Sequence, residues 1–363
     1  MVKSAYIHIP FCKSKCNYCS FVSYCALEKK DLFLKNLQKE IEYFYENEPL
    51  KTLYVGGGTP SVLNPDEIKN IIQNFKFEQN AETTTELNPE DIDEKYLENL
   101  FNIGINRLSF GCQTFNDEIL KQINRRHDSN QVKKVVKLAQ DVGFRNISLD
   151  FIYGLPNQTT SMFLDDLKQA VDLGLTHISL YGLKIEEGCY FYKNTPQNLP
   201  DDDAQADMYL ATIDFLPQVE FKHYEVSNFA QIGFESKHNL TYWNNEEYYG
   251  FGAGAHGYKN GKRYENETNL DKYIANPTKK INSHKLSIQE KLEEEIFLGL
   301  RKMSGIDINN INSKYGINFE QKYNKILTKY LNLKLLAKTD YGYKFTPQGI
   351  LVSNVILAEF LED

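Results

Sequence analysis

The sequence contains no apolar run of about 18 residues and no excess of positive charge. Without such a run, no transmembrane helix is expected. The 363 residues carry a formal net charge of −8, which argues against broad electrostatic binding to nucleic acid or to anionic lipid. Residues Met1 to Ser4 lead directly into an expected strand and leave no room for a signal peptide. We therefore expect a cytoplasmic protein without a nucleic-acid partner.

Cysteine is scarce, with six residues in the chain, and three of the six lie within residues 12–19. This distribution fits a reducing cytoplasm better than a disulfide scaffold. Cys12, Cys16 and Cys19 are separated by three and then two residues, so their thiolates can lie on one loop and face one point. A [4Fe–4S] cluster normally takes four cysteines, so three of them leave one iron open for chemistry.

A structural zinc site is the alternative for this loop, because zinc also binds cysteines at short spacings. Structural zinc sites usually pair two C-x2-4-C knuckles at a distance, and the sequence contains no second knuckle. Cys25 could supply a fourth thiolate, which would favour a closed, structural site. The spacing favours the open cluster and leaves zinc as the second interpretation.

The first half of the chain alternates short β runs with amphipathic helical stretches, which predicts parallel βαβ units. Strands are expected at residues 5–9, 52–55, 83–87, 107–110, 147–152 and 177–183. Helices are expected at residues 31–46, 65–74, 90–101, 117–123, 131–142 and 160–172. Six such units predict an α/β fold with a partial or complete barrel. A doubly wound sheet is the alternative, because the pattern does not show whether the sheet closes.

The chain is expected to have three parts, at residues 1–215, 216–280 and 281–363. The middle part loses the βα rhythm. The last part predicts helices at 289–302, 308–315 and 319–331, strands at 335–338 and 342–345, and a helix at 347–361. This order resembles a small winged-helix-like domain. Acidic residues accompany the basic ones there, so a lid or docking module is favoured over a DNA reader.

Polar and glycine residues cluster where the expected strands end, which is the face at which barrel active sites are built. The second strand is followed by Gly56-Gly-Gly-Thr-Pro-Ser61. A triple glycine allows close approach of a ligand or makes a tight turn, and no Walker A lysine follows it. Any one of the polar residues further along could be a capping or surface residue, but together they suit one ligand: Glu86, Gln113, Arg125 and Asp150.

The cysteine spacing after a strand resembles the cluster motif of the radical S-adenosylmethionine enzymes. The longer phrase from Tyr6-Ile-His-Ile-Pro-Phe-Cys12 to Asn-Tyr-Cys19-Ser-Phe21 resembles the oxygen-independent coproporphyrinogen dehydrogenases and their relatives, the HemW heme chaperones. Further motifs of that family run through nearly the whole chain. The resemblance implies a partial (β/α)6-type radical S-adenosylmethionine barrel with a [4Fe–4S] cluster on Cys12, Cys16 and Cys19.

The resemblance also implies S-adenosylmethionine as a cofactor. The methionine carboxylate needs a cation, which Arg125 or its neighbour Arg126 can supply. The amino group of S-adenosylmethionine is expected at the glycine loop, and its ribose at the carboxylates of Glu86 and Asp150 and the amide of Gln113. Tyr6 and Tyr18 are expected on the cluster side of the site. The residues implied are Tyr6, Tyr18, Gly57, Gly58, Thr59, Glu86, Gln113, Arg125 and Asp150.

The phrase His238-Asn-Leu-Thr-Tyr-Trp243 resembles the heme chaperone branch and suggests a heme contact, since histidine can ligate heme iron and aromatic rings can stack on the macrocycle. A buried, hydrogen-bonded histidine is the alternative. His256, in the glycine-rich segment 250–257, is the rival ligand, and that segment is expected to be a flexible turn or a platform for a ligand.

The resemblance leaves two functions open. The dehydrogenase motif carries a further cysteine where this chain has Phe21, so a heme chaperone is favoured over a radical enzyme that decarboxylates coproporphyrinogen III to protoporphyrinogen IX. Whether the chain is an enzyme stays open. The implied partners are heme, a heme acceptor such as a membrane-bound respiratory protein, and an electron donor such as flavodoxin or ferredoxin.

Overall fold

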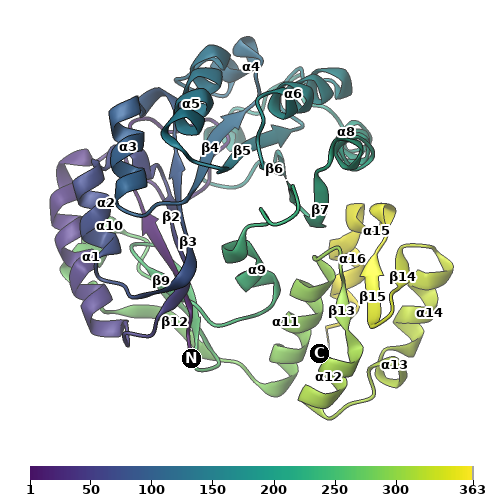
Figure 1. The fold of residues 1–363 in the computed structure, drawn as a ribbon. Helices are drawn as coiled ribbons and strands as arrows, with labels where there is room; N and C mark the ends of the chain where they lie inside the picture. Colours follow the sequence, from purple (N-terminus) through teal and green to yellow (C-terminus); the bar gives the residue numbers. More distant parts are fainter. Residues whose placement is uncertain (362–363) are drawn as a thin grey trace. The chain divides into compact units, whose positions relative to one another are not determined.

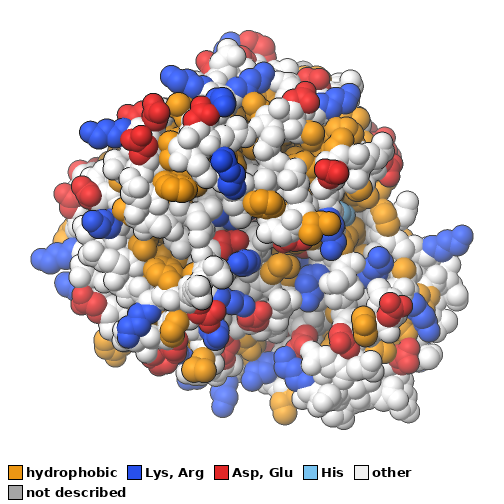
Figure 2. Space-filling view, in the orientation of Figure 1, with side chains coloured by type: hydrophobic (Ala, Val, Ile, Leu, Met, Phe, Trp, Pro, Cys, Tyr) orange, Lys and Arg blue, Asp and Glu red, His pale blue; other side chains and the backbone are white. Residues whose placement is uncertain are grey.

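The computed structural model describes residues 1–361, which divide into two compact units. The first unit comprises Met1–Thr212 and Glu247–His284, and the second comprises Ile213–Glu246 and the chain from Lys285 onward. The segment 216–280 is therefore shared between the two units. Within the described residues, no helix has the length and apolar character needed to cross a bilayer. On the face drawn in Figure 2, acidic and basic side chains are intermingled.

Consecutive parallel strands form the centre of the first unit (Figure 1). The strands of this unit lie in the order β6-β5-β4-β3-β2-β1-β9. A doubly wound sheet reverses its strand order at a switch point, and β1 to β6 show no such reversal. β1 pairs on its second edge with β9, in parallel, so the arc stays open. The strands are β1 Ser4–Ile9, β2 Leu50–Gly57, β3 Phe77–Leu87, β4 Arg107–Gln113, β5 Asn146–Tyr153, β6 His177–Gly182 and β9 Tyr249–Phe251.

Helices α1 to α6 lie on the outer face of this sheet (Figure 1). α2 to α6 begin at side-chain caps, whereas α1 has none. Asn64 with Glu67 and Asp128 with Gln131 form capping boxes at α2 and α5. The predicted helix 90–101 begins later than expected, because Asp93 caps α3 and a separate 3-10 turn precedes it. The helices are α1 Lys30–Phe44, α2 Pro65–Ile72, α3 Glu94–Asn102, α4 Asp117–Gln122, α5 Ser129–Val142 and α6 Thr160–Asp172, with 3-10 turns η1 Leu27–Lys29, η2 Pro60–Val62 and η3 Pro89–Asp91.

The expectation of a flexible turn at residues 250–257 is wrong for the first two residues of that segment, which belong to β9. Gly250 pairs with Tyr6 of β1. A Cβ at Gly250 would come within 1.8 Å of the His256 carbonyl oxygen, so the close approach requires glycine. The other elements of this unit are α7 Tyr190–Lys193, α8 Asp202–Phe215, which runs past Thr212, β10 His256–Lys259, β11 Lys262–Asn266, α10 Leu270–Ala275 and β12 Lys280–Lys285.

Glu40 connects α1 to the segment Glu247–His284 of the same unit. Its side chain is fully buried and accepts hydrogen bonds from Gly252 N at 2.9 Å, Asn266 Nδ2 at 2.7 Å and Tyr273 Oη at 2.6 Å. Lys280 Nζ lies 2.5 Å from Glu40 Oε1 and forms a largely buried ion pair. The carboxylate is thus satisfied by four donors that all lie in the part of the unit after residue 247.

In the second unit, the C-terminal part has an antiparallel sheet in the order β13-β15-β14 beside a run of helices, as the winged-helix-like prediction requires. The predicted helices 319–331 and 347–361 are each divided in two, at Tyr323 and Val352. The elements are η4 Leu216–Val219, β7 Lys222–Glu225, β8 Asn228–Ala230, α9 Lys237–Trp243, α11 Ile288–Leu300, β13 Ile306–Asp307, α12 Ile308–Tyr315, α13 Phe319–Lys322, α14 Asn324–Asn332, β14 Leu336–Lys338, β15 Gly342–Phe345, α15 Pro347–Leu351 and α16 Ser353–Ala358.

Candidate functional site

The three clustered cysteines lie on the loop that follows β1. Cys12 is buried and its Sγ accepts from Thr59 Oγ1 at 3.3 Å, while Cys19 N donates to the Cys16 carbonyl at 3.2 Å. Burial raises the pKa of the Cys12 thiol, and it raises the pKa of Cys19 to about 11. Metal binding must therefore displace protons from these thiols.

The donor set of this loop fits an iron–sulfur cluster, because thiolates are its ordinary ligands and all three come from one short segment. The side-chain rotamers do not complete the site: in residues 1–361, no three Cys, His, Asp or Glu side chains stand in a metal-binding arrangement. The thiols must turn toward a common point to hold a cluster. The assignment of Cys12, Cys16 and Cys19 as ligands remains a prediction from their spacing.

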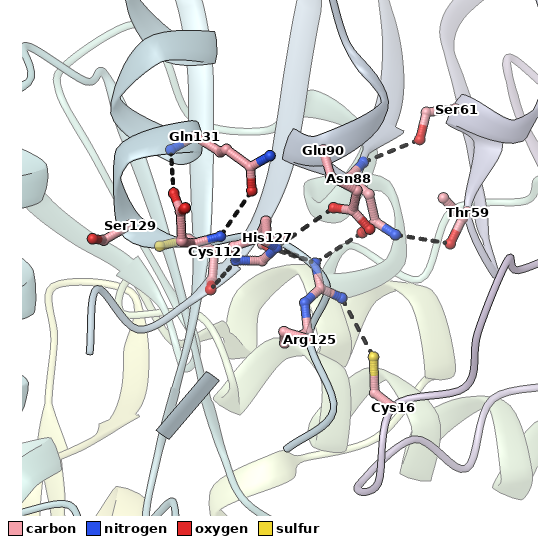
Figure 3. Close-up of polar contacts among 12 residues, drawn as sticks. Cys16, Thr59, Ser61, Asn88, Glu90, Cys112, Arg125, His127, Ser129 and Gln131 are labelled. Carbon is pink, nitrogen blue, oxygen red and sulfur yellow. Dashed lines mark hydrogen bonds and ion pairs between the residues drawn. The ribbon is translucent and has the colours of Figure 1, made fainter. Parts of the chain in front are cut away.

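A chain of hydrogen bonds joins the cysteine loop to the ends of neighbouring strands (Figure 3). Asn88 Nδ2 donates to Thr59 Oγ1 at 3.3 Å, and Arg125 Nη2 donates to Asn88 Oδ1 at 2.9 Å. Arg125 Nη1 lies 3.5 Å from Cys16 Sγ, whereas the side chain of Arg126 is exposed. Of the two neighbouring arginines, Arg125 is therefore the one that lies at the site.

The glycine loop after β2 is packed tightly against the rest of the site. Gly57 has φ of +116°, and a Cβ there would lie 2.8 Å from the His8 ring. A Cβ at Gly58 would lie 2.7 Å from the Phe11 carbonyl oxygen and 3.0 Å from Cys12 Sγ. Side chains are excluded at both positions. Close packing is therefore enough to explain why glycine occupies both positions, as the tight-turn interpretation holds. The loop that these glycines form lies directly beside Cys12.

Side chains on the inner face of the sheet alternate with the apolar ones that face the helices. Glu86 Oε1 accepts from Tyr54 Oη at 2.7 Å, and Oε2 accepts from Gly57 N at 3.0 Å. Asp150 accepts from Ser109 Oγ at 3.0 Å. Burial raises the pKa of Glu86 to about 7 and also raises the pKa of Asp150. The structure therefore encloses both predicted carboxylates within the barrel, where ionising them costs free energy.

The remaining predicted cofactor residues of this unit flank the same region. Gln113 ends β4 with φ of +70°, at an irregularity in the pairing of β4 with β5. Tyr6 lies on β1, and its Oη is 3.0 Å from His8 Nδ1. Tyr18 lies on the cysteine loop and packs against a buried apolar cluster formed by Ile119, Leu120, Ile123, Ile152, Leu155, Cys189 and Phe191. Gly57, Glu86 and Gln113 thus lie at the carboxyl ends of β2, β3 and β4, whereas Tyr6 and Asp150 lie within β1 and β5.

His238 lies in the second unit, on α9, and is 1% exposed. Its Nε2 is 2.8 Å from Tyr242 Oη. This is the buried, hydrogen-bonded arrangement that the sequence left open, and an axial bond from Nε2 to heme iron requires that hydrogen bond to break. His256, the rival, has a side chain that is 65% exposed, with Nδ1 3.7 Å from Glu265 Oε1.

Sequence reasoning passed over Asn88 and His127 at this site. Asn88 directly follows β3, so the rule that placed Glu86 at a strand end could have selected it. His127 lies between α4 and α5 rather than at a strand end, and its Nδ1 reaches Arg125 Nη2 at 3.3 Å. No local sequence pattern marks that contact.

Comparison with known families gives matches along the chain. The profile of the Radical SAM superfamily matches residues 6–170, and the HemN C-terminal domain matches residues 286–352. The heme chaperone HemW of Lactococcus lactis is 41% identical over 370 residues, which cover 99% of this chain and 97% of that protein. HemW of Bacillus subtilis is 37% identical over 99% of both chains, and HemW of Escherichia coli is 36% identical over 70% of this chain and 69% of that protein.

The structure resembles that of coproporphyrinogen III oxidase (HemN) from Escherichia coli, described as a radical SAM enzyme. The TM-score is 0.87, and the match covers 99% of this chain and 90% of the other at 23% identity. At that identity the likeness concerns the fold. It confirms the predicted fold class, an α/β radical SAM fold with a small C-terminal domain.

Proposed function

This chain belongs to the HemW family, and we propose that it is a heme chaperone that binds heme and delivers it to an acceptor protein. The observation that carries the proposal is the identity of 41% to a HemW protein over 99% of the chain, which spans both the cysteine loop and the segment from His238 to Trp243. The acceptor we expect is a membrane-bound respiratory protein. Six cysteines without a disulfide suit the reducing cytoplasm as its location.

The cofactors proposed for this chain are a [4Fe–4S] cluster on Cys12, Cys16 and Cys19 and one S-adenosylmethionine. When bound, the pair supplies one-electron chemistry, with flavodoxin or ferredoxin as the electron donor. Arg125 pairs with the methionine carboxylate, because its Nε is buried and has no acceptor in the structure. The other proposed contacts are Gly57, Gly58 and Thr59 for the amino group, Glu86, Gln113 and Asp150 for the ribose, and Tyr6 and Tyr18 on the cluster side.

Asp150→Ala is expected to weaken S-adenosylmethionine binding by about 1–3 kcal/mol, because a hydrogen bond from the ribose to an enclosed carboxylate is lost. The measurement is equilibrium binding to anaerobically reconstituted protein with its iron and sulfide content determined. Asp172→Ala, at the exposed end of α6, is the control. Unchanged affinity in Asp150→Ala removes this residue from the proposed site.

Heme binding is tested by titrating wild type, His238→Ala and His256→Ala with heme. We expect His238→Ala to lower heme affinity by about tenfold or more, which corresponds to about 1.4 kcal/mol. Iron–sulfur content and S-adenosylmethionine binding should survive, because His238 lies in the second unit and the cysteines lie in the first. A loss confined to His256→Ala would move the ligand to the exposed histidine, and three identical curves would refute both assignments.

The alternative function is oxygen-independent coproporphyrinogen III dehydrogenation, which the resemblance of the segment from Tyr6 to Phe21 leaves open. Phe21 argues against it, because the dehydrogenase motif carries a cysteine there, and this phenylalanine is 69% exposed. We expect purified protein with reductant, S-adenosylmethionine and coproporphyrinogen III to make no protoporphyrinogen IX, as judged by chromatography of the products. A catalytic yield would return the chain to the dehydrogenase class.

A further inference from the structure

The guanidinium of Arg125 is held on several sides by the protein itself (Figure 3). Nη2 donates to the Gly111 carbonyl at 2.7 Å and to Asn88 Oδ1 at 2.9 Å, and it lies 3.3 Å from His127 Nδ1. Nη2 carries two hydrogens, and with three acceptors around it neither hydrogen is available to a ligand. Nη1, near Cys16 Sγ, and the buried Nε keep donor capacity. A guanidinium fixed in this way keeps its plane and its remaining donors in a defined orientation.

The tautomer of His127 follows from its second ring nitrogen. His127 is 4% exposed, and its Nε2 lies 3.1 Å from the Cys112 carbonyl oxygen, which can only accept. Nε2 therefore carries the hydrogen. Burial lowers the pKa of His127 and the charge of Arg125 lowers it further, against the opposing effect of Glu90, so the ring is neutral near pH 7. Its Nδ1 then offers a lone pair to Arg125.

Glu90 also lies next to His127. Its Oε2 lies 3.6 Å from His127 Nδ1, with only 8% of the Glu90 side chain exposed. A carboxylate enclosed next to a neutral imidazole and a guanidinium balances the arginine charge in a region of low dielectric. With the hydrogen on Nε2, His127 Nδ1 has none to donate to Glu90, and Glu90 Oε2 has no hydrogen-bond partner among the described residues. Glu90, from η3, therefore acts on Arg125 through its charge.

We propose that His127, held by the Cys112 carbonyl, is a positioning residue that aims the remaining donors of Arg125 at the carboxylate of the bound cofactor. The inference rests on the proposed function, because it assumes that S-adenosylmethionine is the cofactor. His127 itself touches no ligand in this scheme. Without His127, Nη2 keeps the Gly111 carbonyl and Asn88 as acceptors but loses the contact on its third side. The guanidinium can then tilt, and the charge-assisted pair with the carboxylate loses part of its fixed geometry.

The experiment compares two ligands, S-adenosylmethionine and its decarboxylated analogue, on anaerobically reconstituted wild type, His127→Leu and His127→Asn. In His127→Leu, the affinity for S-adenosylmethionine should fall by about tenfold while the affinity for the analogue stays unchanged. His127→Asn should restore most of the loss, because an amide oxygen can take the place of Nδ1. His223→Leu, which replaces a half-buried histidine stacked on Phe229 in the second unit, is the matched control.

Three outcomes would contradict the proposal, and they distinguish an error about His127 from an error about the cofactor. Equal losses for both ligands in His127→Leu would mean general damage to the site and would overturn the positioning role. No loss for either ligand would overturn it as well. If wild-type protein with a full complement of iron and sulfide bound neither ligand, the proposed cofactor would be wrong, and the inference would fall with it.

Discussion

Alanine in place of Cys12, Cys16 or Cys19 is expected to abolish the brown chromophore of anaerobically reconstituted protein and the EPR signal of its reduced form. Each thiolate binds one iron of the predicted cluster, and removing one leaves two ligands for four irons. The loss should be nearly complete in each variant. Optical absorption, iron and sulfide content and EPR measure it directly.

Cys25→Ala is the informative control for this prediction. Cys25 is exposed but close to the site, since Cys12 N donates to the carbonyl of the preceding residue, Tyr24, at 3.1 Å. We expect Cys25→Ala to keep both signals. Loss of the cluster in that variant would make Cys25 a fourth ligand and close the iron that the open-site interpretation requires. Stoichiometric zinc in place of iron would favour the structural alternative.

Glu40→Ala is expected to lower the free energy of unfolding by about 3–5 kcal/mol, because the change leaves the Lys280 ammonium largely buried without its counter-charge. The hydroxyl of Tyr273 also loses its acceptor, and the amide of Asn266 loses one of its acceptors and keeps the Gly252 carbonyl. Urea denaturation followed by circular dichroism measures the change.

Glu42→Ala provides the matched control on the same helix, because Glu42 is exposed and bonds only to Gln38 of α1 among the contacts described. We expect its effect to stay within about 0.5 kcal/mol. The double variant Glu40→Ala with Lys280→Met should recover part of the loss, since no uncompensated charge remains. Equal destabilisation by Glu40→Ala and Glu42→Ala would contradict the role given to the buried pair.

The six strands of the arc were predictable because they contain short runs of apolar or β-branched residues separated by amphipathic helices. The polar start of β3, at Phe77–Leu87, was missed, since Glu78, Gln79 and Asn80 lack a strand pattern. β9 was missed as well. Its three residues form a strand through pairing with β1 and the glycine contact at Gly250, which join parts of the chain far apart in sequence.

The same limit applies to the candidate site. The strand-end rule selected Glu86, Gln113 and Asp150, because that signal is local. The contact of His127 with Arg125 depends on how α4 and α5 pack, and the choice between Arg125 and Arg126 depends on which side chain turns inward. No sequence pattern within the expected helix 31–46 marks Glu40 as buried, because the donors that bind its carboxylate come from residues 252–280.

The pairing of β1 with β9 has a consequence for synthesis on the ribosome. Ala5 to Ile7 emerge first, but their partners, Tyr249 to Phe251, emerge about two thirds of the chain later. Until then, one edge of β1 carries unpaired backbone donors and acceptors, and such an edge is a template for wrong pairing. Residues 213–246 likewise lack the rest of their compact unit until the chain beyond residue 285 has been synthesised. The nascent chain therefore stays open to misfolding until most of it has been translated.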